Sequence, residues 1–227
     1  MSEVDKKAEK KEKRRIKRLN RWFGFLRFCY YVLTPVLMPI KKLGHKKKYL
    51  DGPYVFVGNH RSVLDVIPIA SAVKAPVHFL AKKELTSKAI GRWFVNKSEC
   101  VLVNRDGQDV RALMQSMKYL KNGETISLFP EGTRNKTDEP FLPFKSGAAM
   151  MAIRTKTPII LVVHGRKLRF FRRNYFYFAE PFEFTEYYDK KLTEELIKEA
   201  DGKLYQKMLE IYLALNDMLE SKKKRKK

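Results

Sequence analysis

The sequence predicts a single α/β domain with a mostly parallel central sheet flanked by helices, preceded by an N-terminal membrane-associating helical segment. From residue 53 onward, short apolar runs alternate with longer stretches whose apolar residues recur every three or four positions. Such alternation of strands and helices is typical of a parallel sheet covered by helices. The chain has 227 residues and a hydrophobic fraction of 44%, which suits one globular domain with tails.

Residues 22–40 form an apolar stretch of 19 residues with a single charge, Arg27. A straight bilayer span needs about 20 apolar residues, and Pro35 and Pro39 are expected to kink or end the helix. The sequence is basic on both sides of the stretch. This favours an anchor whose two ends return to one anionic surface over a spanning helix. A helix packed on the domain remains open as the alternative.

The chain carries 48 Lys and Arg against 25 Asp and Glu, which gives a net charge of +23. Residues 1–21 and 222–227 each hold a net charge of +6, so about half of the excess lies in two tails that are too polar to fold alone. An excess of this size indicates an anionic partner, either a membrane surface or a nucleic acid. We assign 1–48 to a basic tail and anchor, 49–219 to the globular domain and 220–227 to a basic C-terminal tail.

Five apolar runs are expected to form strands, and an aromatic-rich segment after them one or two more. The five runs lie at 53–59, 76–81, 100–104, 125–130 and 158–163, and the later segment at 167–184. Helical spacing is found at 64–73, 85–94, 110–120, 146–155 and 190–219. We expect the last helix to break near Asp201 and Gly202, because glycine is a poor helix former.

The strongest local signal for chemistry is His60, which directly follows the first predicted strand, with Asp65 five residues later. A carboxylate in the first helical turn can accept a hydrogen bond from one imidazole nitrogen, which leaves the other nitrogen available as a base. An ordinary turn histidine beside an N-terminal capping aspartate is the structural alternative.

A second polar cluster, Glu131-Gly132-Thr133-Arg134, follows the predicted strand 125–130. Glycine permits close approach of the backbone, threonine offers a hydroxyl, and the planar guanidinium of arginine suits a phosphate group. Because functional groups gather where parallel strands end, this cluster and the His60 cluster are expected to share one site. Taken alone, it is equally an ordinary polar loop.

Taken together, Asn59-His60, four residues, Asp65 and then Pro130-Glu131-Gly132-Thr133-Arg134 resemble the glycerolipid acyltransferase family, and within it the bacterial lysophosphatidic-acid type. The resemblance runs from about residue 22 to residue 184. The element Lys82-x-Glu84-Leu85 also matches the family. The family's second block keeps Arg105 but has Glu99 and Leu102 where Gly and Phe are usual, which leaves the acceptor and the acyl preference open.

The resemblance implies transfer of a fatty acyl group from a thioester to the sn-2 hydroxyl of lysophosphatidic acid, with His60 as general base oriented by Asp65. The acyl donor, acyl carrier protein or coenzyme A, is a co-substrate, and no cofactor is implied. Arg105 and Arg134 are the candidates for the acceptor's phosphate. Glu131, Gly132 and Thr133 are expected to shape that pocket, and Lys82 is a further substrate-binding candidate. His164, at the end of the predicted strand 158–163, is a weaker candidate for a role in the site.

Two other interpretations stay open. A related acyltransferase would use glycerol 3-phosphate or a lyso-aminolipid as acceptor, and a nucleic-acid-binding protein would use the aromatic and basic run at 166–178. The two cysteines, Cys29 and Cys100, show neither a disulfide framework nor zinc-ligand spacing. We therefore expect a reducing compartment and no metal. From the basic flanks and tails we expect attachment to the cytoplasmic face of an anionic membrane and no nucleic-acid partner.

Overall fold

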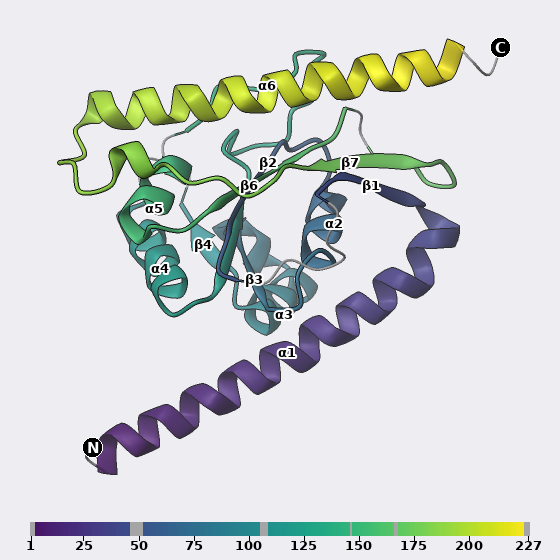
Figure 1. Ribbon diagram of the computed structural model, residues 1–227. Coiled ribbons are helices and arrows are strands. Elements are labelled where there is room, and N and C mark those ends of the chain that lie inside the picture. Colours follow the sequence, from purple (N-terminus) through teal and green to yellow (C-terminus); the bar gives the residue numbers. More distant parts are fainter. Residues whose placement is uncertain (1–2, 46–51, 105–108, 146, 166–167, 225–227) are drawn as a thin grey trace.

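The computed structural model describes residues 3–45, 52–104, 109–145, 147–165 and 168–224. Within these ranges, a seven-stranded sheet lies between two layers of helices, with strand order β1-β7-β6-β2-β5-β3-β4 (Figure 1). The predicted α/β domain with a mostly parallel sheet and flanking helices is confirmed. An N-terminal helix is present as well.

The centre of the sheet is parallel, as the five apolar runs predict. Neighbouring strands pair in parallel from β6 through β2, β5 and β3 to β4. Two further strands extend the other edge, where β7 is antiparallel to β6 and β1 is parallel to β7. The bounds are β1 Ile40–Gly44, β2 Val55–Gly58, β3 Val77–Lys82, β4 Val101–Val103, β5 Thr125–Leu128, β6 Ile159–Val163 and β7 Asn174–Phe178.

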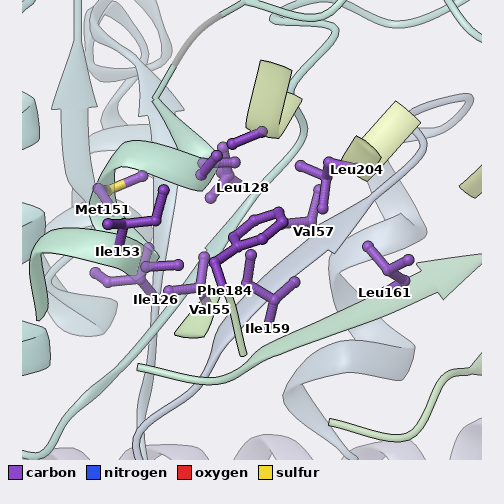
Figure 2. Close-up of a cluster of buried hydrophobic side chains, with 14 of the residues drawn as sticks. Val55, Val57, Ile126, Leu128, Met151, Ile153, Ile159, Leu161, Phe184 and Leu204 are labelled. Carbon is purple, nitrogen blue, oxygen red and sulfur yellow. The ribbon is translucent and has the colours of Figure 1, made fainter. Parts of the chain in front are cut away.

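Helices cover both faces of the sheet, and strand residues alternate between the two hydrophobic cores. Val55 and Val57 of β2 point to one core, and Phe56 between them points to the other. Figure 2 shows the first core, where Phe184 and Leu204 pack over the strands. Its layer consists of α4 (Val110–Lys121), α5 (Ala148–Thr155) and α6 (Glu194–Lys224), and the opposite layer of α1 (Glu3–Leu37), α2 (Val66–Ala70) and α3 (Ala89–Ser98).

The N-terminal helix α1 packs on the domain through its middle. Leu19 and Phe23 are buried in the second core. The Arg15 guanidinium binds the carboxylates of Glu99 and Glu124, at 2.6 and 2.8 Å. The alternative of a helix packed on the domain therefore holds for this part of α1. In the described part of the chain, no helix is both long and apolar enough to cross a bilayer.

Three sequence-based expectations differ from the structure. The helix expected to break near Gly202 is continuous, because Ala200 and Leu204 on either side are fully buried and their packing outweighs the poor helix propensity of glycine. The helix expected at 85–94 begins at Ala89, after a 3₁₀ turn from Lys83 to Ser87. In that turn the hydroxyls of Thr86 and Ser87 donate to carbonyls three residues back.

The third difference is β1, a strand that periodicity did not reveal. Its sequence, Ile-Lys-Lys-Leu-Gly, was expected to belong to the basic flank of the anchor. Pairing with β7 brings it into the sheet, and Gly44 permits this because a Cβ there would lie 2.1 Å from the Phe178 carbonyl oxygen. Within the described residues, the aromatic-rich segment expected to hold one or two strands forms one, β7. Two short 3₁₀ turns complete the fold, Val63–Asp65 and Thr185–Tyr187.

Candidate active site

The two polar clusters lie side by side because the strands that precede them are neighbours. β2 ends at Gly58 and leads into His60, and β5 ends at Leu128 and leads into Glu131. The two strands are paired in parallel, so both chain exits are at the same edge of the sheet. The expected meeting of the clusters is thus observed.

Asp65 orients His60 and caps a helical turn at the same time. His60 Nδ1 lies 3.1 Å from Asp65 Oδ2, and the same oxygen accepts the backbone N–H groups of Arg61 and Ser62, each at 2.7 Å. Because a carboxylate only accepts, this contact selects for the neutral ring the tautomer with the proton on Nδ1 and the lone pair on Nε2. The cap expected as the structural alternative is thus present, and the His60–Asp65 contact that the catalytic interpretation requires is present with it.

The Asp65 carboxylate is almost fully buried, with 1% exposure. Burial by itself would raise the pKa of Asp65, but the adjacent His164 and His60 imidazoles and the Ser62 N–H outweigh it and hold that pKa well below its usual range. The group is therefore an anion at neutral pH. A fixed negative charge beside Nδ1 would stabilise an imidazolium at this position.

His164 is a second imidazole on the same carboxylate. Its Nε2 lies 3.4 Å from Asp65 Oδ1, and its backbone is tied to Asn59 in both directions. The Asn59 amide donates to the His164 carbonyl at 2.8 Å, and its oxygen accepts the His164 N–H at 3.0 Å. This pair of hydrogen bonds joins the ends of β2 and β6. His164 is only a weak candidate from the sequence, and the signal that identifies it is the parallel pairing of β2 with β6.

Glu131 braces the backbone of the histidine. Its Oε1 accepts the His60 N–H at 2.7 Å, and its Oε2 accepts the Leu142 N–H at 2.9 Å. Burial raises the pKa of Glu131, and the two N–H groups oppose that rise. Both oxygens of the carboxylate thus accept backbone N–H groups inside the protein, and one of these bonds holds the backbone of His60.

The loop that follows Glu131 wraps around the histidine segment. The Asn135 N–H donates to the His60 carbonyl at 2.6 Å. The Arg61 guanidinium donates to backbone carbonyls of the same loop, those of Thr137, Glu139 and Pro140. These bonds fix the backbone of the histidine segment on the loop that follows Glu131.

A cavity of about 480 Å³ opens at the imidazole. His60 stacks on Phe129, with ring centroids 4.2 Å apart, and forms part of the cavity wall. The polar part of the lining includes Lys82, Asn104, Asp109 and Lys145, and the apolar part includes Leu80, Val103, Leu113, Leu128 and Met151. The site therefore combines an imidazole, charged side chains and an apolar chamber.

The predicted site residues are placed as follows. Lys82 lines the cavity and pairs with Glu84 at 2.8 Å. Gly132 lines it too, with φ of +64°, and a Cβ there would press on the Lys145 side chain at 3.1 Å. Thr133 and Arg134 are exposed beside the cavity rather than in its wall. Arg105 lies outside the described residues.

A family model described as Acyltransferase matches residues 39–165, which is more than half of the chain. This chain belongs to the acyltransferase family. The family predicted from the sequence is therefore confirmed, and the matched region contains both the histidine cluster and the Glu131 loop.

Individual members of the family are similar over much of the chain. A 1-acyl-sn-glycerol-3-phosphate acyltransferase of Helicobacter pylori is 32% identical over 126 residues, 55% of this chain and 51% of that protein. One of Saccharomyces cerevisiae is 26% identical over 185 residues, 79% of this chain and 61% of that protein. The chain thus spans about half to three fifths of the length of these relatives.

The fold is also that of a solved acyltransferase. The crystal structure of the 1-acyl-sn-glycerophosphate (LPA) acyltransferase PlsC from Thermotoga maritima matches with a TM-score of 0.59 and 26% identity. The match covers 90% of this chain and 82% of that one. The similarity therefore includes the helices outside the matched family region.

Proposed function

We propose that this acyltransferase moves a fatty acyl group from a thioester to the sn-2 hydroxyl of lysophosphatidic acid and so forms phosphatidic acid. The observation that carries the proposal is the His60–Asp65 pair at the mouth of a cavity with cationic and apolar walls. The named activity of the relatives from Helicobacter pylori and Saccharomyces cerevisiae supports it.

In the proposed reaction His60 Nε2 takes the proton of the lipid hydroxyl as its oxygen attacks the thioester carbonyl. The tetrahedral intermediate then breaks its carbon–sulfur bond, and the leaving thiolate takes the proton back from the imidazolium. Base catalysis of this kind contributes roughly 10²–10⁴-fold, and alignment of the two substrates supplies much of the rest. Asp65 keeps its charge throughout and holds the ring.

The cavity offers a place for each end of the substrates. Its apolar wall suits a fatty acyl chain, because aliphatic carbons leave water there. Lys82 and Lys145 in its lining suit the acceptor's phosphate, with Arg134 and Arg105 as further phosphate ligands. In this scheme Gly132 and Thr133 shape the loop beside the phosphate, and the donor is acyl carrier protein or coenzyme A.

We further propose that the enzyme works at the cytoplasmic surface of an anionic membrane, held by α1. The C-terminal half of α1 exposes Phe25, Phe28, Val32 and Val36. These positions recur every three or four residues and so form one stripe. Arg27, the only charge in the apolar stretch, donates to the carbonyls of residues 73 and 74 and is therefore held against the domain. An apolar stripe beside basic tails is typical of helices that lie in a membrane surface.

Acceptor competition tests the proposal. Purified full chain is given an acyl thioester with lysophosphatidic acid, with the matching monoacylglycerol that lacks the phosphate, or with glycerol 3-phosphate. We expect lysophosphatidic acid to be preferred by at least about tenfold in kcat/KM over the phosphate-free acceptor, because a phosphate paired with cations contributes more than about 1.4 kcal/mol. Equal use of both acceptors would remove the phosphate-binding roles, and preference for glycerol 3-phosphate would identify a different acceptor.

A further inference from the structure

The connection from β6 to β7 presents two phenylalanines to solvent. Phe170 and Phe171 are 59% and 73% exposed, whereas Phe176 and Phe178 of the following strand are buried. This segment belongs to the aromatic and basic run of the sequence, which has no part in the proposed reaction. Two adjacent exposed aromatic rings are unusual on the surface of a soluble protein.

The turn that carries these rings is built rigidly. The Asn174 side chain accepts the Arg169 N–H at 2.9 Å and donates to the carbonyls of Arg169 and Arg172, at 3.0 and 2.8 Å. Phe171 adopts φ of +56°, a conformation that side chains with a Cβ rarely adopt. Backbone strain of this kind persists where the surroundings fix it and is concentrated at functional positions.

The turn is also joined to the end of α1. The Phe171 N–H donates to the Leu37 carbonyl at 2.7 Å, and the Asn174 N–H donates to the Pro39 carbonyl at 2.7 Å. Phe170 lines an apolar cavity of about 360 Å³, whose other walls include Phe23 and Leu33 of α1. Phe170 therefore adjoins the apolar face of α1 that lines this cavity, and Phe171 follows it in the same turn.

The charge around the rings has one sign. Residues 168–173 read Leu-Arg-Phe-Phe-Arg-Arg, without an acidic residue. Arg169, Arg172 and Arg173 are all exposed. Aromatic rings at the level of lipid headgroups, with arginines beside them, are typical of segments that enter the interface of an anionic bilayer.

We propose that Phe170 and Phe171 insert into the interface of an anionic bilayer as a second contact point beside α1. A second contact away from the axis of α1 adds to the hold of the apolar stripe and so restricts the orientation of the domain on the bilayer further. This contact serves lipid attachment and not acyl transfer, so it can be tested separately from the proposed reaction. Stacking on nucleic-acid bases explains the aromatic and basic run less well, because it does not account for the position of Phe170 beside an apolar helix face.

The test measures binding of the full chain to vesicles of phosphatidylcholine and phosphatidylglycerol by co-sedimentation, without substrates. The variant is Phe170→Ser with Phe171→Asn, since asparagine tolerates positive φ. Leu213→Ser is the matched control, because Leu213 is 52% exposed on α6 in the opposite layer. Burial of one aromatic side chain changes a partition constant by at least about tenfold. We expect at least that loss for the variant, wild-type binding for the control and an unchanged Tm for both.

A second measurement reports insertion without relying on affinity. Phe170→Trp in a Trp22→Phe, Trp93→Phe background is titrated with vesicles that contain brominated lipid, and we expect quenching of the fluorescence of the introduced tryptophan. Unchanged vesicle binding of the double variant together with unquenched fluorescence would overturn the proposal. So would tighter, Phe170-dependent binding to an oligonucleotide than to vesicles at matched salt, or loss of acyl transfer to detergent-dispersed acceptor at unchanged Tm.

Discussion

Replacing Asp65 by asparagine removes the charge of the orienting group and keeps its shape. The asparagine oxygen can still accept the N–H groups of Arg61 and Ser62, which Asp65 Oδ2 accepts at 2.7 Å. It can also accept the His60 Nδ1 proton. The geometry around the imidazole is therefore retained, and the change acts mainly on the imidazolium that forms during proton transfer.

The size of the effect follows from the distance between the two groups. His60 Nδ1 and Asp65 Oδ2 are 3.1 Å apart in a nearly water-free position. Two unit charges about 4 Å apart attract by about 4 kcal/mol at an effective dielectric constant of about 20. Because about 1.36 kcal/mol corresponds to a factor of ten in rate, we expect kcat to fall by about 10³-fold with little change in the KM for the lipid acceptor.

The assay follows release of the thiol from the acyl donor, with lysophosphatidic acid as acceptor, over a range of acceptor concentrations. Asp138→Asn serves as the control, since Asp138 is an exposed carboxylate of the neighbouring loop. Circular dichroism of both variants checks that the fold is retained. An Asp65→Asn enzyme with the kcat of the wild type would refute the assignment of the carboxylate to transition-state stabilisation.

Three further predictions concern side chains around the site and in the sheet. Glu131→Gln replaces one of the two oxygens that accept backbone N–H groups by an NH₂ donor. We expect the free energy of unfolding to fall by about 1–3 kcal/mol, and kcat to fall as well. Denaturant titration measures the stability, and an unchanged value would show that Glu131 does not hold the backbone of His60. Asp65 has a folded-state pKa below its unfolded value, so it stabilises the protein above the unfolded pKa, and this contribution is lost in acid. Because His164 helps to lower that pKa, His164→Phe should reduce the difference in stability between neutral and acidic pH. An unaltered dependence of Tm on pH would exclude a contribution from the His164–Asp65 contact. Burial lowers the pKa of Lys42 to about 8 from 10.5, so the unfolded chain binds more protons between these values and stability rises with pH there. Lys42→Met should then raise the free energy of unfolding by about 3 kcal/mol at neutral pH and leave it unchanged in strong base. A stabilisation that persists in strong base would contradict burial of the charge as the cause.

The part of the site that the sequence predicts correctly follows from a single rule, that parallel strands end at one edge of a sheet. His60 and Glu131 each directly follow an apolar run, so their proximity could be expected before the pairing of the strands was known. The hydrogen-bond partners of Glu131 could not be predicted, because the sequence does not distinguish a carboxylate that accepts backbone N–H groups from one that faces a substrate. His164 was undervalued because its contact with Asp65 depends on which strand pairs with β2.

In the fold, too, local sequence signals are reliable and features that depend on long-range pairing are not. Strands buried on both faces have continuous apolar sequences and were located correctly, whereas β1 contains Lys41 and Lys42 and is held by pairing with β7. Helix α6 continues past Gly202 because burial on either side decides its conformation, which local propensity does not report. Expectations based on local sequence thus fail where long-range packing determines the structure.

The most direct measurement of the central claim is the formation of phosphatidic acid from lysophosphatidic acid and an acyl thioester by the purified wild-type chain and by His60→Ala. The imidazole is only partly buried, so its removal should leave the fold intact. We predict product with the wild-type enzyme and a rate at least about 10²-fold lower with the variant, at an unchanged circular dichroism spectrum. A folded His60→Ala enzyme that makes phosphatidic acid at the wild-type rate would contradict the role of His60 as the base.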